Sequence, residues 1–526
     1  ELDAATLDIS GNVDIDGVLE TDNLTIGGAQ GSDGQVLTST GSGVGWEDAA
    51  GGGPTFKAFG TSSIMVGDDA TGTINAANYN SGFGVDVFAA LTSGDENTMV
   101  GFSAGKGITT AGSNVGVGNN VFEGTLTGGN NIAIGLGVLT AATSGFNNTA
   151  VGTTAMGGVV TGRDNTCLGF DSGDIITSGQ FNTFVGSQSG ELTTTGNNNV
   201  GVGGNALAAN TTAHDNTAVG FNALAANTTA YSNVAVGKSA GAGVTTGAGN
   251  VYMGYNAALV ASTAHDNVII GYNAGDAVTE EGHSVFVGVD AGGAATNTGD
   301  NTAIGAGAFA LGNSTSNTQN TAIGRLALPD AGLAGYGNTA VGYYAGQACT
   351  GALQNTLIGR QAGNNITTGD ENICLGYLAR PSAAAGTSQV IVAYNLAGKG
   401  NSTGLFGGSS GVYNEGNTTA WQTVSDIRIK KNISDNKIGL DAINKIKIKN
   451  FEYRTEDEIT ELPKESVIKK EGNQVGVIAQ EIQEILPDLV KEQTTGCLSV
   501  NSDNLTWYLI NAVQELSAEI KKLKGE

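Results

Sequence analysis

A short motif, Asn-x-x-aliphatic-Gly, repeats along most of the chain. From Asn97 it starts again every 17 residues as far as Asn301. Further copies, with steps of 19, 18, 17 and 17, begin at Asn320, Asn338, Asn355 and Asn372. Extending the frame backwards reaches two weaker matches, 63–67 and 80–84. A short fixed period of this kind is typical of a β-solenoid with one coil per repeat, so we predict about 19 coils over residues 61–376.

The five positions of the motif predict how a coil packs. Position one is Asn in 16 of the 17 repeats from Asn97 onwards, with Ser284 as the exception, and stacked Asn side chains can hydrogen-bond from coil to coil. Position five is always Gly, which fits a strand end with a positive φ or a close backbone approach. Positions two and four are Thr or aliphatic, and with a period of two we expect them to face the coil interior.

Position three is uncharged in every repeat and mostly apolar, which predicts that the strand is buried on its other face as well. A wide internal core is one explanation. We favour burial against other copies of the chain around a three-fold axis. The predicted fold is therefore mainly β, a trimeric parallel β-solenoid or β-roll shaft of 17-residue coils.

The regions on either side of the repeats differ from them. Residues 1–60 are predicted to be an N-terminal β connector, with one strand near Leu7–Gly17 and a second short β element around Gln35 and Trp46. Residues 377–424 are predicted to break the repeat frame and form a distal tip. Aromatic side chains in a Gly-, Ser-, Asn- and Thr-rich setting suit sugar binding, although they could equally cap the end of the solenoid. The aromatic candidates for receptor binding are Tyr394, Phe406, Tyr413 and Trp421.

Composition supports a repetitive fold and divides the chain in two. The 526 residues include 84 Gly without a Gly-X-Y period, and 40% are hydrophobic, which excludes both collagen and a disordered acidic chain. Residues 1–424 hold 8 Lys and Arg against 31 Asp and Glu, whereas residues 425–526 hold 15 against 18. Such an acidic chain is not expected to bind nucleic acid. The longest apolar runs fall short of 18 residues, so no membrane insertion is expected either.

The repeats resemble those of a known group of adhesins. Runs such as Asn148–Gly152 and Asn301–Gly305 are similar to the head repeats of trimeric autotransporter adhesins, and related repeats occur in phage fibres. The resemblance covers residues 63–376. It implies a left-handed parallel β-roll that assembles as a homotrimer.

After residue 424 the pattern changes to that of a small α+β domain. We expect a helix over Gly439–Ile448, a strand over Asn450–Arg454, and a strand that runs into an amphipathic helix over Gln474–Pro487. A long helix closes the sequence. Its apolar residues have heptad spacing, which predicts self-association, and they are Leu509, Val513, Leu516, Ile520 and Leu523.

This block, residues 425–526, resembles the intramolecular chaperone auto-processing domain of phage tail fibres, tail spikes and endosialidases. The resemblance rests on Ser-Asp-x-Arg-hydrophobic-Lys-x-Asn-Ile from Ser425, on Gly476–Glu481, and on the closing helix. It implies that the domain trimerises, guides the folding of the fibre and then cleaves itself off between Val424 and Ser425. The family's Ser–Lys dyad would correspond to Ser425 and Lys430. Self-cleavage of this serine type is the only enzymatic activity that we expect.

The chemistry of such a dyad is reasonable. A Ser hydroxyl becomes a useful nucleophile when a neighbouring base takes its proton. A Lys can be that base only when neutral, which desolvation or nearby cations such as Arg428 and Lys431 would favour. Attack on the Val424 carbonyl would be intramolecular and gain from high effective molarity. The alternative is that Ser425 merely caps the domain and Lys430 is a solvated charge.

Other candidate chemistry is weaker. His214, His265 and His283 all fall in turns just before position one, and we assign them to the surface, expecting no metal and no cofactor. Cys167 and Cys374 occupy position three, which predicts small core residues. Acidic residues are scattered through the turns, so glycanase activity is not expected.

Taken together, these patterns predict a phage tail fibre for host-surface recognition, assembled in the host cytoplasm and carried in the virion. Its partners would be two further copies, other tail or baseplate proteins at the N-terminal end, and a host cell-surface glycan or protein. One alternative is a cellular trimeric adhesin with a non-cleaving trimerisation cap. The sequence opens without a signal peptide, which counts against it. Ice or mineral binding by a Thr ladder is weaker still, because the Thr pairs fall in turns that look irregular.

Overall fold

The computed structural model describes residues 76–408 except 281, 295, 297–298, 311–317 and 330–334, residues 411–414, and residues 425–525 except 463–467, 469 and 494–495. Before residue 76 it describes strands alone. The chain divides into two compact units, Glu1–Thr423 and Val424–Glu526. The first unit contains all of the repeats, and the second coincides with the block that differs from them in composition.

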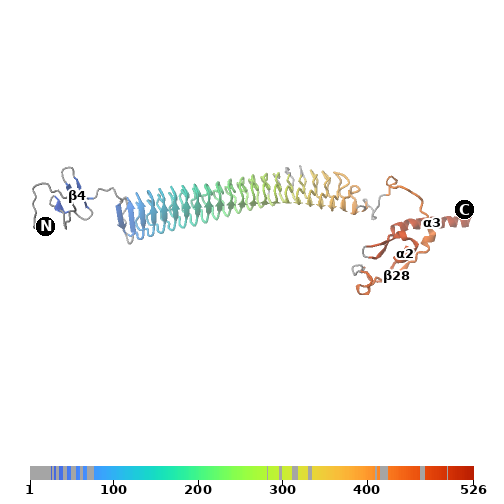
Figure 1. Cartoon of the computed structure of the whole chain (residues 1–526). Coiled ribbons are helices and arrows are strands. Elements are labelled where there is room, and N and C mark those ends of the chain that lie inside the picture. Colours follow the sequence, from blue (N-terminus) through green and yellow to red (C-terminus); the bar gives the residue numbers. More distant parts are fainter. Residues whose placement is uncertain are drawn as a thin grey trace, which may run out of the picture. The chain divides into compact units, whose positions relative to one another are not determined.

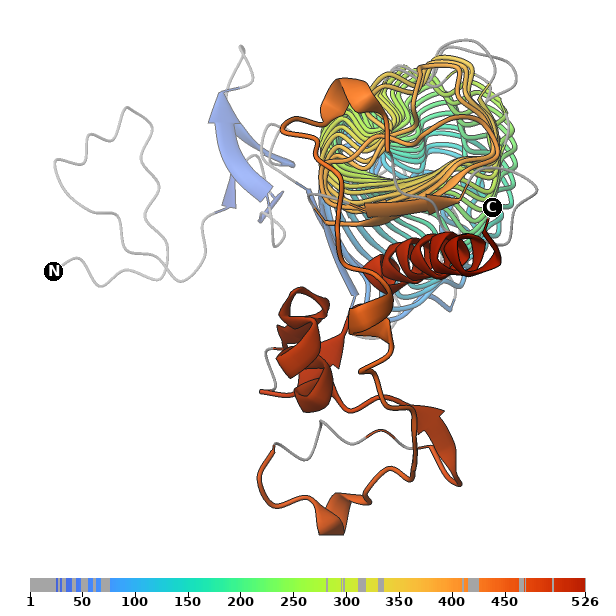
Figure 2. The ribbon, with the colours of Figure 1, turned by 90° about the vertical axis from the view of Figure 1, so that its right-hand side faces the viewer.

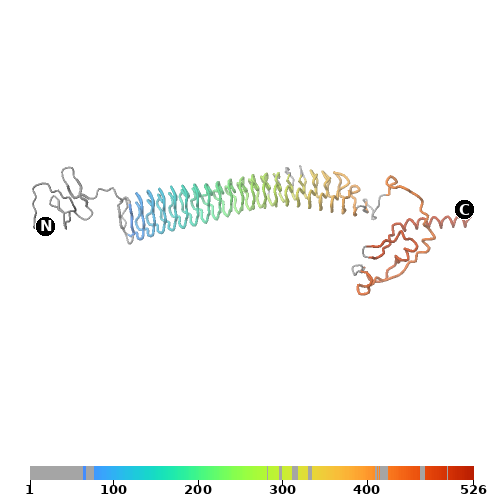
Figure 3. Tube along the Cα trace, in the orientation of Figure 1, coloured from blue at the N-terminus to red at the C-terminus, as the bar shows by residue number. Residues whose placement is uncertain are grey.

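The first unit contains a parallel β-solenoid, as the repeat predicts. Each strand pairs in parallel with the strand one coil further on, from β6 to β26 (Figure 1). The coils keep nearly the same outline along the rod (Figure 3), and seen along the axis they superpose with their strands on one side (Figure 2). The strands are β6 (Ser63–Gly67), β7 (Ser81–Gly84), β8 (Thr98–Val100), β9 (Val115–Val117), β10 (Ile132–Ile134), β11 (Thr149–Val151), β12 (Thr166–Leu168), β13 (Thr183–Val185), β14 (Val200–Val202), β15 (Thr217–Val219), β16 (Val234–Val236), β17 (Val251–Met253), β18 (Val268–Ile270), β19 (Val285–Val287), β20 (Thr302–Ile304), β21 (Thr321–Ile323), β22 (Thr339–Val341), β23 (Thr356–Ile358), β24 (Ile373–Leu375), β25 (Val390–Ala393) and β26 (Gly404–Gly407).

The orientation predicted for the strands was wrong. Position three, not positions two and four, faces the coil interior, and it is buried in every repeat from Met99 to Cys374. Positions two and four point outwards and are exposed or half-buried, as Val115 and Val117 are. Position three is mainly Ala, Gly and Cys. A large residue such as Phe184 fits because the neighbouring position is Gly201, where an added Cβ would lie 3.0 Å from the Phe184 ring.

The predicted Asn ladder is confirmed. The side chain of Asn199 is fully buried, and its Nδ2 and backbone N both donate to Oδ1 of Asn182, one coil earlier, at 3.0 Å. Nδ2 also donates to the carbonyl oxygen of Ala213 at 2.9 Å. Because buried amide groups are costly when unpaired, this repeating arrangement holds successive coils in one register.

The predicted role of the Gly at position five is also confirmed. Gly220 has φ of +140°, and an added Cβ would lie 2.4 Å from the carbonyl oxygen of Gly237 in the next coil. Both the backbone conformation and the close approach therefore require Gly.

A column of Thr side chains in the turns is more regular than expected. The column runs from Thr177 to Thr279, with Ser262 in place of one Thr. Each hydroxyl donates a hydrogen bond to a backbone carbonyl of the following coil.

The parallel ladder runs past residue 376, where we expected the shaft to end. Gln389 follows Asn372 by 17 residues, is fully buried, and donates its backbone N–H to Asn372 Oδ1 at 3.2 Å. Strand β26 adds a shorter coil, after which β27 (Gly411–Asn414) pairs antiparallel to it. At the other end β5 (Thr55–Phe59) pairs antiparallel with β6. These two strands cover the edges of the parallel sheet.

The N-terminal part contains short antiparallel pairs. Strands β3 (Gln35–Ser39) and β4 (Val44–Asp48) form the second β element that we expected, and they place Leu37 opposite Trp46. Strands β1 (Thr25–Ile26) and β2 (Ala29–Gln30) also pair. The strand expected over Leu7–Gly17 lies outside the described residues.

The second unit is a small α+β domain with a long final helix, as predicted. The strand β29 (Gln474–Gly476) leads into α2 (Ala479–Ile485), whereas the helix expected over Gly439–Ile448 shortens to α1 (Leu440–Ile443). Tyr508 of α3 (Asp503–Lys524) packs against Ile482. The remaining elements are η1 (Ile427–Ile429), β28 (Lys449–Phe451), η2 (Glu456–Glu458), η4 (Pro487–Leu489), β30 (Val490–Glu492) and β31 (Leu498–Val500). Among the residues that the structure describes, no helix is long and apolar enough to cross a bilayer.

Candidate functional site

The start of the second unit brings the predicted Ser–Lys pair together. Lys430 Nζ lies 2.6 Å from Ser425 Oγ, within hydrogen-bond distance. The short turn η1 makes this possible, because its carbonyl at Ile427 accepts the backbone N–H of Lys430 at 3.2 Å and turns the chain back. Both side chains are exposed. Val424, the other half of the predicted scissile bond, lies outside the described residues.

A second contact orders the same turn. Asp426 caps η1 by accepting the backbone N–H of Arg428 at 2.8 Å, and its carboxylate also pairs with the Arg428 guanidinium at 2.5 Å. These hydrogen bonds from Arg428 lower the pKa of Asp426. We expected Arg428 to act as a cation beside Lys430. Its charge is instead directed to Asp426, so it contributes to the shape of the turn.

The predicted apolar seam of α3 is exposed in the single chain. Its members lie between 42% and 87% exposed, and they are Leu509, Val513, Leu516, Ile520 and Leu523. The neighbouring side of the helix is the one that packs on the domain, through Tyr508 and Ala512. A shallow apolar groove of about 240 Å³ lies beside the seam and is lined by Ile443, Ile446, Ile448, Leu505 and Leu509.

The structure describes the side chains of two of the four aromatic candidates for receptor binding, Tyr394 and Phe406. Tyr394 is 62% exposed and Phe406 is 43% exposed, on the last two coils. Phe406 follows the buried Leu405 and lies on the outward face of β26. The side chain of Tyr413 and the whole of Trp421 lie outside the described residues.

Tyr394 instead belongs to a column of stacked side chains that the sequence analysis missed. The column occupies position six of the repeat on five successive coils, directly after Gly in the first four and after Ala393 in the last, and its members are Arg325, Tyr343, Arg360, Tyr377 and Tyr394. The Arg360 guanidinium carbon lies 5.9 Å from the Tyr343 ring centre and 5.4 Å from that of Tyr377, and Arg325 lies 5.7 Å from Tyr343. Tyr377 and Tyr394 have ring centres 5.2 Å apart. We call this column the Arg–Tyr ladder; comparing position six across the repeats would have found it.

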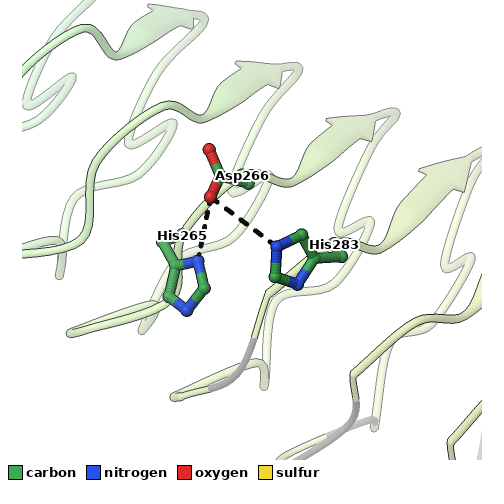
Figure 4. Close-up of side chains that lie close together, drawn as sticks. All are labelled: His265, Asp266 and His283. Carbon is green, nitrogen blue, oxygen red and sulfur yellow. Dashed lines mark hydrogen bonds and ion pairs between the residues drawn. The ribbon is translucent and has the colours of Figure 1, made fainter.

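The histidines also form an arrangement that the sequence analysis did not anticipate. We compared His214 with His265, which lie three coils apart, but the structure places His265 and Asp266 beside His283 (Figure 4). The ligand atoms of these three side chains all lie within 4.8 Å of one another. All three residues are exposed.

The structure defines a two-part protein. A parallel β-solenoid is followed in the chain by a small domain, and the first turn of that domain brings a Ser and a Lys together. Residues 425–491 match the family described as "Chaperone of endosialidase", so the C-terminal unit carries a domain of that family. The chain is also 36% identical over 104 residues to the "Long tail fiber protein Gp37" of Enterobacteria phage M1 and to that of Enterobacteria phage Ox2. The match covers 19% of this chain and 38% of each relative. No solved structure matches this chain.

Proposed function

We propose that this chain is a phage tail-fibre protein that assembles as a homotrimer and then releases its C-terminal unit by cleavage between Val424 and Ser425. The observation that carries the proposal is the 2.6 Å contact between Ser425 Oγ and Lys430 Nζ inside a domain of the endosialidase-chaperone family. The similarity to long tail fibre proteins supports the virion role.

In the proposed reaction, Ser425 Oγ attacks the carbonyl carbon of Val424 while Lys430 Nζ, as a neutral amine, accepts the hydroxyl proton. The proton then passes to the departing nitrogen of Ser425, which leaves Val424 joined to Ser425 through an ester. Water hydrolyses this ester and separates the two units. The nucleophile and the carbonyl belong to adjacent residues, so proximity replaces a substrate pocket.

The exposure of the dyad supports a link between cleavage and assembly. Water favours the charged form of a Lys side chain, whereas burial favours the neutral form that can accept a proton. Lys430 is exposed in the single chain, so the burial would come from neighbouring copies. The exposed seam of α3, together with the apolar groove beside it, is a surface on which three copies can associate.

The shaft offers a second surface for the proposed association, through different positions from those first predicted. Positions two and four form an outward sheet face of Thr and aliphatic side chains that repeats on each coil, for example Ile132 and Ile134, which are 40% and 39% exposed. A continuous apolar face of this length is typical of an interaction surface. Packing three such faces around an axis would bury it.

For host recognition we propose the Arg–Tyr ladder as the contact with an anionic surface glycan. Four of the eight Lys and Arg of residues 1–424 fall in the short stretch 325–399, although the shaft as a whole is strongly acidic. Tyrosine rings stack on sugar rings and guanidinium groups pair with carboxylate or phosphate. Phe406, Tyr413 and Trp421 remain candidates for the same role. The N-terminal end is the proposed attachment to other tail or baseplate proteins.

The test of the proposed function is intact-mass spectrometry of the purified chain beside Ser425→Ala, Lys430→Ala and Lys437→Ala. We expect the wild type and Lys437→Ala, the matched control at an exposed Lys outside the turn, to split before Ser425. Ser425→Ala and Lys430→Ala should remain whole. An uncut wild type, or cleavage in Ser425→Ala, would exclude the proposed dyad and favour the alternative, an adhesin with a non-cleaving cap.

A further inference from the structure

The turn just before the Asn ladder brings metal-ligating side chains from adjacent coils together. His265 and Asp266 occupy this turn in one coil, and Gly282 and His283 occupy it in the next. The turns are held in register by the backbone, since His283 N–H donates to the His265 carbonyl at 3.2 Å. Asp266 and His283, at equivalent positions of the two turns, both have a positive φ, at 54° and 63°. Their side chains therefore project from the backbone in similar directions.

The distances are close to those of a metal site. Asp266 Oδ2 lies 3.1 Å from His265 Nδ1 and 3.9 Å from His283 Nε2 (Figure 4). Tetrahedral Zn²⁺ with bonds of about 2.0–2.2 Å holds its ligand atoms roughly 3.4 Å apart. The three ligand atoms lie within 4.8 Å of one another, and the exposed side chains can close the difference by small rotations.

The environment of His283 supports metal binding. Its other ring nitrogen, Nδ1, lies 4.0 Å from Asp300 Oδ1, on the following coil. This distance is too long for a hydrogen bond, but a small rotation of either exposed side chain would let the carboxylate receive Nδ1–H. Nε2 would then be the ligand atom, which is the usual arrangement behind a metal-bound His. Gly282 contributes by its lack of a side chain, because an added Cβ would lie 2.7 Å from Nδ1 and Cε1 of His265.

The chain contains a matched turn that lacks the third ligand. His214 and Asp215 occupy the same places three coils earlier, with Nδ1 and Oδ2 2.6 Å apart. There the next coil supplies Tyr231, whose ring stacks on His214 with the ring centres 5.4 Å apart. The His214 turn is therefore a His–Asp pair, covered by an aromatic ring, whereas the His265 turn adds a second His.

We propose that His265, Asp266 and His283 form a binding site for a divalent transition-metal ion such as Zn²⁺. Two imidazoles and one carboxylate suit this class of ion, and three protein ligands leave a fourth position for water or an external ligand. The bound ion would link two adjacent coils beside Ser284. At this position the buried ladder has a hydroxyl group in place of the two N–H donors of an Asn side chain. This proposal is independent of the tail-fibre function.

The test is calorimetric titration of the untagged, metal-free full chain with Zn²⁺, beside His265→Asn, His283→Asn and His214→Asn. We expect one Zn²⁺ per chain, a loss of affinity of roughly tenfold or more in the first two variants, and no change in His214→Asn. Mg²⁺, a poor partner for imidazole, should give no comparable binding.

Several results would overturn the site: no Zn²⁺ uptake at micromolar concentrations, equal effects in all three variants, or equal binding of Mg²⁺. Circular dichroism of the metal-free variants controls for folding, which these exposed turn residues are not expected to affect. Should either His variant misfold, Asp266→Asn removes the central ligand by another route and is expected to weaken Zn²⁺ binding as strongly. Unchanged affinity in that variant would equally contradict the proposal.

Discussion

At the scale of single residues, the shaft depends on side chains whose polar groups have no access to water. Asn216 is fully buried, and its amide donates to the Ala230 carbonyl at 2.8 Å and accepts the backbone N–H of Asn233 at 3.0 Å. Each of these partners is supplied by a coil that lies further along the chain. The ladder is thus a polar core that runs beside the apolar one.

The ladder leads to a prediction for Asn216→Ala. The substitution leaves the Asn233 N–H without its acceptor and removes one of the two amide donors to the Ala230 carbonyl, which keeps Asn227 Nδ2 at 3.1 Å. We expect it to lower the stability of the shaft by about 1–3 kcal/mol. The measurement is the midpoint of urea unfolding. Thr229→Ala, at an exposed position of the same coil, is the control and should shift the midpoint little. Equal shifts in the two variants would show that the ladder contributes little.

Residue types predicted some features of the coil and failed for others, for physical reasons. Asn and Gly at fixed positions have specific hydrogen-bonding and backbone requirements, so their roles were predictable. Which face of the strand points into the coil was not predictable. Both faces are uncharged, and alternation with a period of two does not say which of them is inside. The small side chains common at position three, such as Ala133 and Ala150, would have favoured this position as the one packed inside the coil.

At the scale of elements, the rod presents different chemistry on different columns. Position six carries the Arg–Tyr ladder over its last coils, and elsewhere the same column is less uniform, with Lys238, Tyr255 and Tyr272 as a shorter run. Stacking along a column needs identical coil spacing, which the parallel register supplies. A surface of this kind is built one repeat at a time, so its chemistry can change along the rod without a change of fold.

The Arg–Tyr ladder leads to a prediction for Arg360→Ala and Tyr377→Ala. If the ladder contacts an anionic glycan, each change should weaken binding roughly five- to thirtyfold, as expected for the loss of about 1–2 kcal/mol. The measurement is binding of the purified fibre to an array of neutral and anionic bacterial surface polysaccharides.

The control for the Arg–Tyr ladder is Arg163→Ala. Arg163 has the same stacking geometry, 5.6 Å from the rings of both Phe146 and Phe181, in a distant part of the shaft. Its removal should leave binding unchanged. A loss of binding that was equal for Arg163 and Arg360, or that was confined to neutral glycans, would contradict the role of the ladder.

The candidate sites differ in how far the sequence alone could predict them. The contact between Ser425 and Lys430 lies within five residues and within a recognisable motif, so both residues could be predicted. The Arg–Tyr ladder lies in one column, so comparing position six across the repeats would have found it. The cluster of His265, Asp266 and His283 joins two different turn positions on adjacent coils, and that contact depends on the coil outline as well as on the repeat.

At the scale of the whole molecule, the two units have complementary tasks in the proposed account. A long parallel solenoid must align its register repeatedly in three chains, and exposed sheet edges invite mispairing while it forms. A C-terminal unit that associates first through the α3 seam would set that register. Cleavage afterwards would make assembly irreversible, so the fibre would be kinetically stable.

Native mass spectrometry of the purified wild-type chain, beside Leu516→Glu and Ala518→Glu, tests this account most directly. Leu516 lies on the seam and Ala518 is exposed on α3 away from it. The wild type and Ala518→Glu should give three shaft chains that end at Val424, with the C-terminal unit released. Leu516→Glu should give uncut single chains. Uncut wild-type trimers, or cleaved monomers of Leu516→Glu, would contradict the proposed coupling of assembly to cleavage.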